Sequence, residues 1–179
     1  MSKEEIVAEM RRFIGVDDEG RALLAKLRTL LSGRGEAIEK IFYDKIRSEP
    51  ASAEFLQGSD VEARHVVSDW LLDLLEGRHD LAYFEKRVRI GVTHVRIGLP
   101  IRYPIGMLEV LREEIDKVID ENMDSDEAKA ARRLMGRLLS LDLSIFNHAY
   151  EECMFDRLDQ SAGISRELFY SLMRAADIK

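Results

Sequence analysis

Apolar residues recur at spacings of three and four along almost the whole chain, and this periodicity limits the possible folds more than any other property of the sequence. Such spacing places apolar side chains on one face of an α-helix. Strand signals are nearly absent, since the sequence has no run of alternating β-branched residues and no Asn-Gly or Asp-Gly turn. The three prolines, Pro50, Pro100 and Pro104, lie outside the long periodic stretches. The sequence therefore predicts an all-α domain.

Residues that begin and end helices divide the chain into segments. Asp17 or Asp18 can cap the second helix, which ends at Gly33. The third helix stops before Pro50, because the residue preceding a proline avoids the helical region. We expect helices over 3–14, 17–33, 35–48, 51–57, 59–77, 80–98, 101–122, 125–160 and 164–176.

The predicted helix over 125–160 carries two apolar stripes. The first stripe consists of Leu134, Leu138, Leu141, Ile145, His148 and Glu152. The second consists of Leu139, Leu143, Phe146, Tyr150 and Met154. Two apolar stripes on one helix require two partners, of which one is the domain core and the other a second subunit packed as a helical bundle. The alternative is that both stripes face one broad core, and the sequence leaves both interpretations open.

Length and charge exclude several classes of protein. A chain of 179 residues corresponds to one domain. The formal charge of −7 argues against a nucleic-acid-binding domain, which normally carries a basic face. The first residues have no apolar stretch of a signal peptide, no apolar run approaches the length of a membrane helix, and Cys153 has no second cysteine to pair with. We expect a cytoplasmic domain without a nucleic-acid or membrane partner.

The histidines are the residues most capable of carrying chemistry, because no nucleophile elbow, phosphate-binding loop, dinucleotide fingerprint or Cys-x-x-Cys motif occurs. His79 lies in the connection before the helix over 80–98 and is expected to be exposed, whereas His148 is expected to be a packed core histidine. His94 shares an apolar stripe with Ile90 and Ile97, near a helix end. Taken alone, this pattern is more typical of a satisfied core histidine than of a ligand.

The residues around His94 resemble a known family. Ile90-Gly91, His94 and Val95-Arg96-Ile97-Gly98-Leu99-Pro100 precede two long helices, and Phe42-Tyr43-Asp44 lies in the third predicted helix. Over residues 10–160 the chain resembles the haem domain of the globin-coupled sensors, a family that includes aerotaxis transducers and haem-regulated diguanylate cyclases. The resemblance implies a globin fold with an extra N-terminal helix, no separate D helix and long last two helices. It also implies a sensor domain over 1–160, with 161–179 forming a C-terminal helix or linker toward a possible output domain.

The resemblance assigns roles in binding haem b (iron protoporphyrin IX). It makes His94 the proximal iron ligand, a role that suits a neutral imidazole, and Tyr43 the distal donor to a bound diatomic gas. Arg96, Arg89 and Lys86 are candidates for pairing with the haem propionates. The expected apolar walls are Phe42, Ile46, Phe55, Val61, Leu72, Val88, Ile97, Met107, Leu111 and Leu143, and Tyr103 is expected to pack on the proximal side of the haem.

The helix predicted over 59–77 departs from the family. Its expected pocket face consists of Val61, His65, Ser68 and Leu72. The resemblance places an aliphatic residue where this chain has His65, and the usual distal histidine of myoglobin-type globins where it has Val61. His65 could ligate the iron opposite His94 and give a six-coordinate haem, act as a distal hydrogen-bond donor, or point to solvent. Ser68 could join the hydrogen bonds to oxygen or bond a carbonyl of its own helix.

The function implied by the resemblance is a haem-based sensor of O2, CO or NO with no enzymatic step of its own. We expect a homodimer formed through the helices over 101–122 and 125–160. Two alternatives remain at the level of the sequence. The first is a gas-processing haem protein, such as an oxygen carrier or a nitric oxide detoxifying protein. The second is a helical interaction module without a cofactor.

Overall fold

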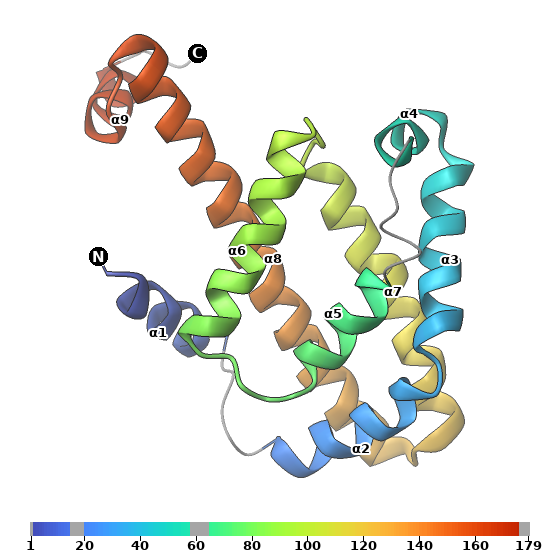
Figure 1. Ribbon diagram of the computed structural model, residues 1–179. Helices are drawn as coiled ribbons and strands as arrows, with labels where there is room; N and C mark the ends of the chain where they lie inside the picture. Colours follow the sequence, from blue (N-terminus) through green and yellow to red (C-terminus); the bar gives the residue numbers. More distant parts are fainter. Residues whose placement is uncertain (1, 15–19, 58–64, 176–179) are drawn as a thin grey trace.

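The computed structural model of the protein describes residues 2–14, 20–57 and 65–175, which form helices and contain no β-strand (Figure 1). The all-α prediction is therefore confirmed. The helices are α1 (Lys3–Ile14), α2 (Arg21–Ser32), α3 (Gly35–Ser48), α4 (Pro50–Ala53), the 3-10 helix η1 (Glu54–Leu56), α5 (Val66–Leu74), α6 (Leu81–Arg96), α7 (Arg102–Asn122), α8 (Ser125–Ala162) and α9 (Arg166–Ala175). The predicted caps Asp17 and Asp18 lie outside the described residues.

The beginning of α5 differs from the predicted helix over 59–77. His65 has a left-handed backbone, with φ 51° and ψ 38°, and is the residue immediately before α5. A residue in this conformation does not continue a right-handed helix. The helix therefore begins at Val66.

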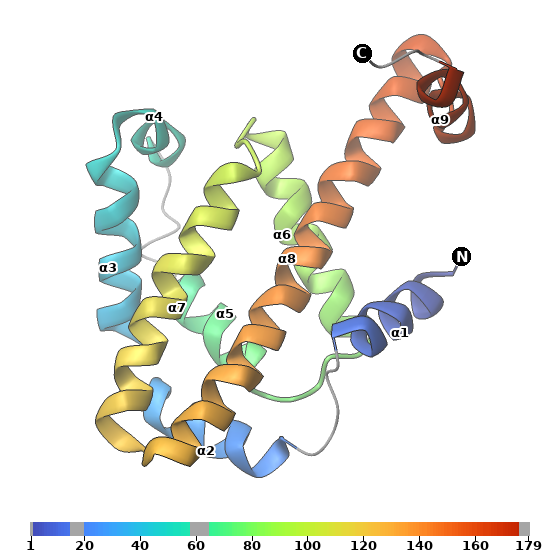
Figure 2. The same cartoon turned by 180° about the vertical axis from the view of Figure 1, so that it is seen from behind.

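The centre of the fold is the packing of α6 and α7 against the long helix α8, with α3 beside α5 and α7, α2 across one end of the molecule and α1 beside α6 and α8 (Figure 1). Gly91 allows α6 to approach α8 closely, because a Cβ at this position would lie 2.7 Å from the Cβ of Ala149. The fully buried core comes from α2, α5, α7 and α8, and includes Leu27, Leu31, Leu74, Ile115, Ile119, Met135 and Leu138. Viewed from behind, α9 lies at the end of α8 farthest from α2 (Figure 2).

Both predicted apolar stripes of α8 contribute to the core of this one chain. Leu138 and Ile145 come from the first stripe, Leu139 and Phe146 come from the second, and all four are buried. One broad core therefore accounts for this stretch of α8. Met154, farther along the second stripe, is 47% exposed. None of the helices in the described part of the chain combines the length and the apolar character that a membrane span requires.

His79 is buried, which corrects the expectation that it is exposed. Only 3% of the residue is accessible, its Nε2 lies 2.9 Å from the carbonyl oxygen of Leu74, and its ring meets that of Tyr83 edge to face. The reason is the short connection from α5 to α6, in which Asp80 caps α6 by accepting a hydrogen bond from the Tyr83 N–H. Burial lowers the pKa of His79, which favours the neutral ring.

Candidate functional site

An apolar cavity of about 710 Å³ lies among α3, α5, α6 and α7. Its volume is within the usual range for small-molecule and cofactor sites. Of the side chains predicted for the site, Phe42, Tyr43, Ile46, Phe55, His94, Ile97, Tyr103, Met107 and Leu111 line this cavity. Residues that were not predicted as pocket residues also line it, among them Val66, Val67, Trp70, Ile90, Leu108 and Phe146.

His94 projects from the last turns of α6 into this cavity. Its Nδ1 is buried and has no hydrogen-bond partner among the described residues, and its ring lies 5.9 Å from that of Phe146, measured between centroids. Burial lowers the pKa of His94, so the neutral imidazole is favoured. The arrangement leaves a neutral ring nitrogen available to a ligand in the cavity.

The corner after α6 holds the histidine in place. The Leu99 N–H donates to the carbonyl oxygen of His94 at 2.9 Å, and Gly98 has a φ of 73°, a value that favours glycine. The hydroxyl of Tyr150, on α8, donates to the carbonyl oxygen of Leu99 at 2.7 Å. A contact between distant parts of the chain therefore supports the end of the helix that carries His94.

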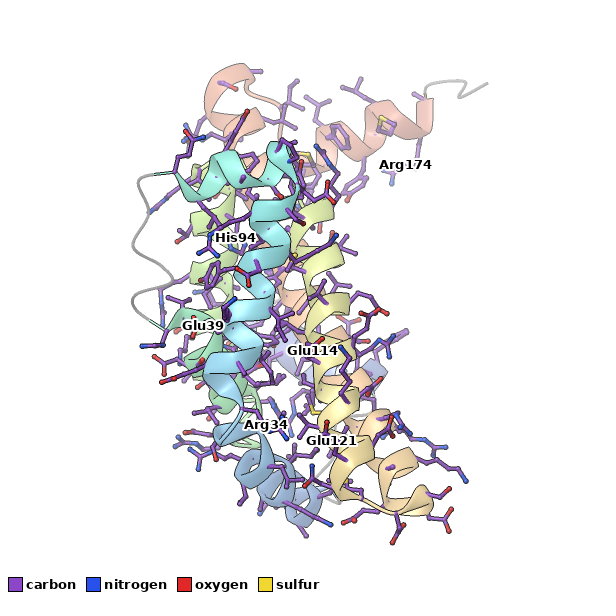
Figure 3. The ribbon with its side chains drawn as sticks, turned by 90° about the vertical axis from the view of Figure 1, so that its right-hand side faces the viewer. Arg34, Glu39, His94, Glu114, Glu121 and Arg174 are labelled. Carbon is purple, nitrogen blue, oxygen red and sulfur yellow. The ribbon has the colours of Figure 1, made fainter. Side chains whose placement is uncertain are left out.

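Tyr43 reaches the same cavity from α3 and is only 3% exposed. Its ring packs edge to face against that of Phe42, with 5.2 Å between the centroids. The fold thus brings a phenol from α3 and an imidazole from α6, which are distant in sequence, to one apolar space. Figure 3 views the molecule over α3, with His94 labelled.

The other predicted pocket residues are not brought to the cavity. On α5 the lining residues are Val66, Val67 and Trp70, and this differs from the expected face that includes His65, Ser68 and Leu72. His65 immediately precedes α5, Ser68 and Leu72 lie on a part of the α5 surface that does not line the cavity, and Val61 lies outside the described residues. Val88 faces a separate groove beside α1, and Leu143 packs against the core.

Glu39 explains the positions of His65 and Ser68. This carboxylate of α3 is 3% exposed, and it accepts hydrogen bonds from the Val67 N–H at 3.2 Å and from the Ser68 hydroxyl at 2.6 Å (Figure 3). The His65 side chain is 59% exposed, with its Nδ1 3.4 Å from Glu39 Oε2. Glu39 therefore satisfies the first turn of α5, a task usually performed by a capping residue. The sequence offered no clear signal of this role.

The charged groups at the cavity also differ from those expected. Nζ of Lys86 lies 3.1 Å from Oδ1 of Asp73. Arg89 lines the groove beside α1. Arg96 is exposed and does not line the cavity. Lys45 and Arg102 line the cavity instead. Lys45 Nζ lies 3.4 Å from a Glu49 oxygen, and the Arg102 guanidinium lies 4.8 Å from the centroid of the Tyr103 ring.

Solved globin domains share this architecture. The globin domain of a Geobacter sulfurreducens globin-coupled sensor matches with a TM-score of 0.75 and 28% identity, over 80% of this chain and 96% of that one. The globin domain of E. coli DosC, in its ferric form, matches with a TM-score of 0.68 and 19% identity, over 79% of this chain and 99% of that one, a likeness of fold alone. The helices and the cavity that holds the histidine and the tyrosine define a globin domain, so the predicted fold is confirmed.

The family follows from the sequence. The chain belongs to the Protoglobin family, whose model matches residues 3–154. It is also 27% identical, over 92% of its length, to the Heme-based aerotactic transducer HemAT of Halobacterium salinarum. The chain spans about a third of the length of that relative, 36%. The resemblance to globin-coupled sensors is confirmed by these matches.

Proposed function

We propose that this domain binds haem b in the cavity among α3, α5, α6 and α7 and senses a diatomic gas, which is O2, CO or NO. The observation that carries the proposal is the neutral imidazole of His94, which enters the same apolar cavity as the phenol of Tyr43. The likeness to a globin-coupled sensor domain and to a haem-based transducer supports it.

The residues present fit the cofactor. A buried ring nitrogen without a partner is uncommon in proteins, and His94 Nδ1 is such an atom. A neutral histidine is the form that ligates metal ions, so His94 would hold the iron. The bound haem supplies an iron that takes up a diatomic gas. Lys45 and Arg102 carry the positive charges at the cavity that would pair with the haem carboxylates.

Tyr43 would discriminate among gases by donating a hydrogen bond from its phenolic hydroxyl to bound oxygen, which accepts it better than carbon monoxide does. We expect Tyr43→Phe to retain haem and to release oxygen about five- to tenfold faster, which corresponds to the loss of one hydrogen bond. Carbon monoxide, which accepts hydrogen bonds poorly, serves as the internal comparison and should dissociate at nearly the same rate. Equal acceleration for both gases, measured by stopped flow, would argue against this role.

His65 is outside this proposal as an iron ligand, because its ring is exposed and lies beside Glu39. We expect His65→Leu to leave the absorption spectrum of the ligand-free ferrous protein unchanged. Sharp, split α and β bands in the wild-type protein that merge into one broad band in His65→Leu would restore His65 as the second axial ligand.

The absorption spectrum of haem-reconstituted protein tests the central proposal. The wild-type protein should show a strong Soret band in its ferric, ferrous and ferrous-carbonyl forms. His94→Ala should weaken haem binding, whereas His148→Ala serves as the matched control, since His148 is a partly buried histidine that does not line this cavity. If wild-type protein takes up no haem, the remaining function is that of a helical interaction module.

The proposal also includes a cytoplasmic homodimer formed through α7 and α8, with sensing rather than catalysis as the role of this domain. Exposed apolar side chains on the two helices, Ile105 and Met154, support such a contact. Sedimentation equilibrium measures the association state directly, and replacement of both residues by serine should favour the monomer. A wild-type monomer at all concentrations would exclude the dimer.

A further inference from the structure

A buried polar cluster connects α5, α6 and α8. Its centre is Asp142, on α8, which is completely inaccessible to solvent, as is Arg87 on α6. Neither residue lines the cavity. Buried charges are costly unless they are paired and hydrogen-bonded, so the contacts of this carboxylate restrict how the three helices pack.

Asp142 is satisfied by groups from two other helices. The indole N–H of Trp70, on α5, donates to Oδ2 at 2.6 Å. The hydroxyl of Tyr83, on α6, donates to Oδ1, and Nε of Arg87 lies 2.9 Å from Oδ2. Nη2 of Arg87 also donates to the carbonyl oxygen of Trp70 at 3.0 Å. Nη1 of the same guanidinium lies 2.9 Å from Asp73 Oδ2. Each helix is thus bonded to both of the others.

Trp70 differs from the other partners of Asp142 because it also lines the cavity. Within the described residues, Tyr83 and Arg87 contact the carboxylate but do not line the cavity, whereas the Trp70 side chain does both. A molecule that shifts the indole within the cavity must therefore alter the bond from its N–H to Asp142. Water is excluded from this acceptor and cannot replace the lost bond.

We propose that Trp70 is a positioning residue that couples occupancy of the cavity to the packing of α8, through its bond to Asp142. The inference rests on the proposed function, since the occupant is haem with its gas ligand. α8 continues from Asp142 to Ala162 and carries α9 at its far end, so a small change in tilt at Asp142 becomes a larger displacement there (Figure 2). The coupled element is therefore the α8–α9 end of the domain.

Ultraviolet resonance Raman spectroscopy tests the first step without any substitution, because Trp70 is the single tryptophan of the chain. The indole band that reports hydrogen bonding of the N–H is recorded in the ferrous protein with and without carbon monoxide. We expect the band to shift when the gas binds. An identical band in the two forms overturns the proposal, even if the protein binds haem normally.

Hydrogen–deuterium exchange of α8 tests the second step. Trp70→Phe removes the donor that belongs to a cavity-lining residue, and Tyr83→Phe is the matched control because it removes another donor to Asp142 from a residue outside the cavity. We expect carbon monoxide to change the exchange of α8 in the wild type and in Tyr83→Phe, and this change to be lost in Trp70→Phe. Persistence of the change in Trp70→Phe, or its equal loss in both variants, overturns the proposal.

The proposed function and the coupling role of Trp70 are overturned by different results. A wild-type protein without a Soret band after haem addition overturns the proposed function, and the inference about Trp70 falls with it. A haem-loaded protein that binds carbon monoxide, with an unchanged indole band, leaves the proposed function intact and overturns the inference alone. If Trp70→Phe does not fold, the Raman measurement on the wild-type protein still decides the first step.

Discussion

At the scale of single residues, the surroundings of each histidine determine its role. His79 is enclosed by the end of α5 and the beginning of α6, and its ring donates to the carbonyl oxygen of Leu74. Burial also lowers the pKa of His94, but its Nδ1 has no hydrogen-bond partner in the part of the chain that the structure describes, and its ring enters the cavity. His65 is exposed beside Glu39. Of these three environments, that of His94 is the one suited to a ligand from outside the chain.

The buried His79 predicts a pH dependence of stability. Burial lowers its pKa below the ordinary value of 6.5, so the unfolded chain binds a proton at a higher pH than the folded protein does. This part of the stability is complete above pH 6.5 and is lost as the pH falls toward the lowered pKa. In the haem-free protein, His79→Gln, which keeps an N–H donor, should reduce the fall in the free energy of unfolding below pH 6.5. Urea titrations at several pH values measure this, and an unchanged fall would contradict the assignment.

At the scale of secondary-structure elements, α8 is defined by its ends and by one close crossing. Asp124 accepts hydrogen bonds from the N–H groups of Asp126 and Glu127, and Gly163, with φ 65°, ends the helix. These are local signals that a sequence displays directly. The crossing with α6 depends on Gly91, whose missing side chain leaves room for Ala149.

The crossing of α6 and α8 predicts opposite effects for two similar substitutions. Gly91→Ala should lower the free energy of unfolding by about 1–3 kcal/mol, because the added methyl group meets the rigid Cβ of Ala149 at 2.7 Å. Gly136→Ala is the matched control within α8, where no atom lies within 4 Å of the added Cβ, and should increase stability by up to about 1 kcal/mol. Urea denaturation measures both, and equal effects would exclude steric crowding at the crossing.

At the scale of the whole molecule, the cavity is a space of about 710 Å³ bordered mainly by α3, α5, α6 and α7, with Phe55 of η1 and Phe146 of α8 also lining it, and its contents affect the stability of the entire domain. A ligand that binds only the folded state stabilises it according to its concentration and affinity. α3, α5, α6 and α7 all contribute side chains to the lining of the cavity. Bound haem would therefore contact all four of these helices. Occupancy of this cavity and the stability of the domain would therefore be linked.

Haem addition should therefore raise the melting temperature of the domain. At free haem about a thousandfold above its dissociation constant, the gain is about 4 kcal/mol, which corresponds to a shift of about 10 °C for a protein of this size. The shift should be much smaller in His94→Ala than in the wild type. Calorimetry with and without haem measures it, and an equal shift in both proteins would show that His94 does not contribute to binding.

The features that the sequence alone determined are those set by neighbours along the chain. The helical class, the N-terminal helix, the helix over Gly35–Ser48 and the bounds of α7 and α8 all follow from spacing, capping residues and proline, which act within a few positions. The sequence motif around His94 indicated the globin family because its residues are neighbours along the chain.

The tertiary structure decided which polar groups meet. Glu39 and Val67 are 28 positions apart, and Trp70 and Asp142 are 72 apart, so no local pattern indicated that these pairs would bond. Burial likewise placed His79 in the core and left His65 exposed, although both lie near helix ends. The physical reason is that a buried polar group must find a partner wherever the packed helices present one, and that position depends on the whole arrangement of helices rather than on the adjacent residues.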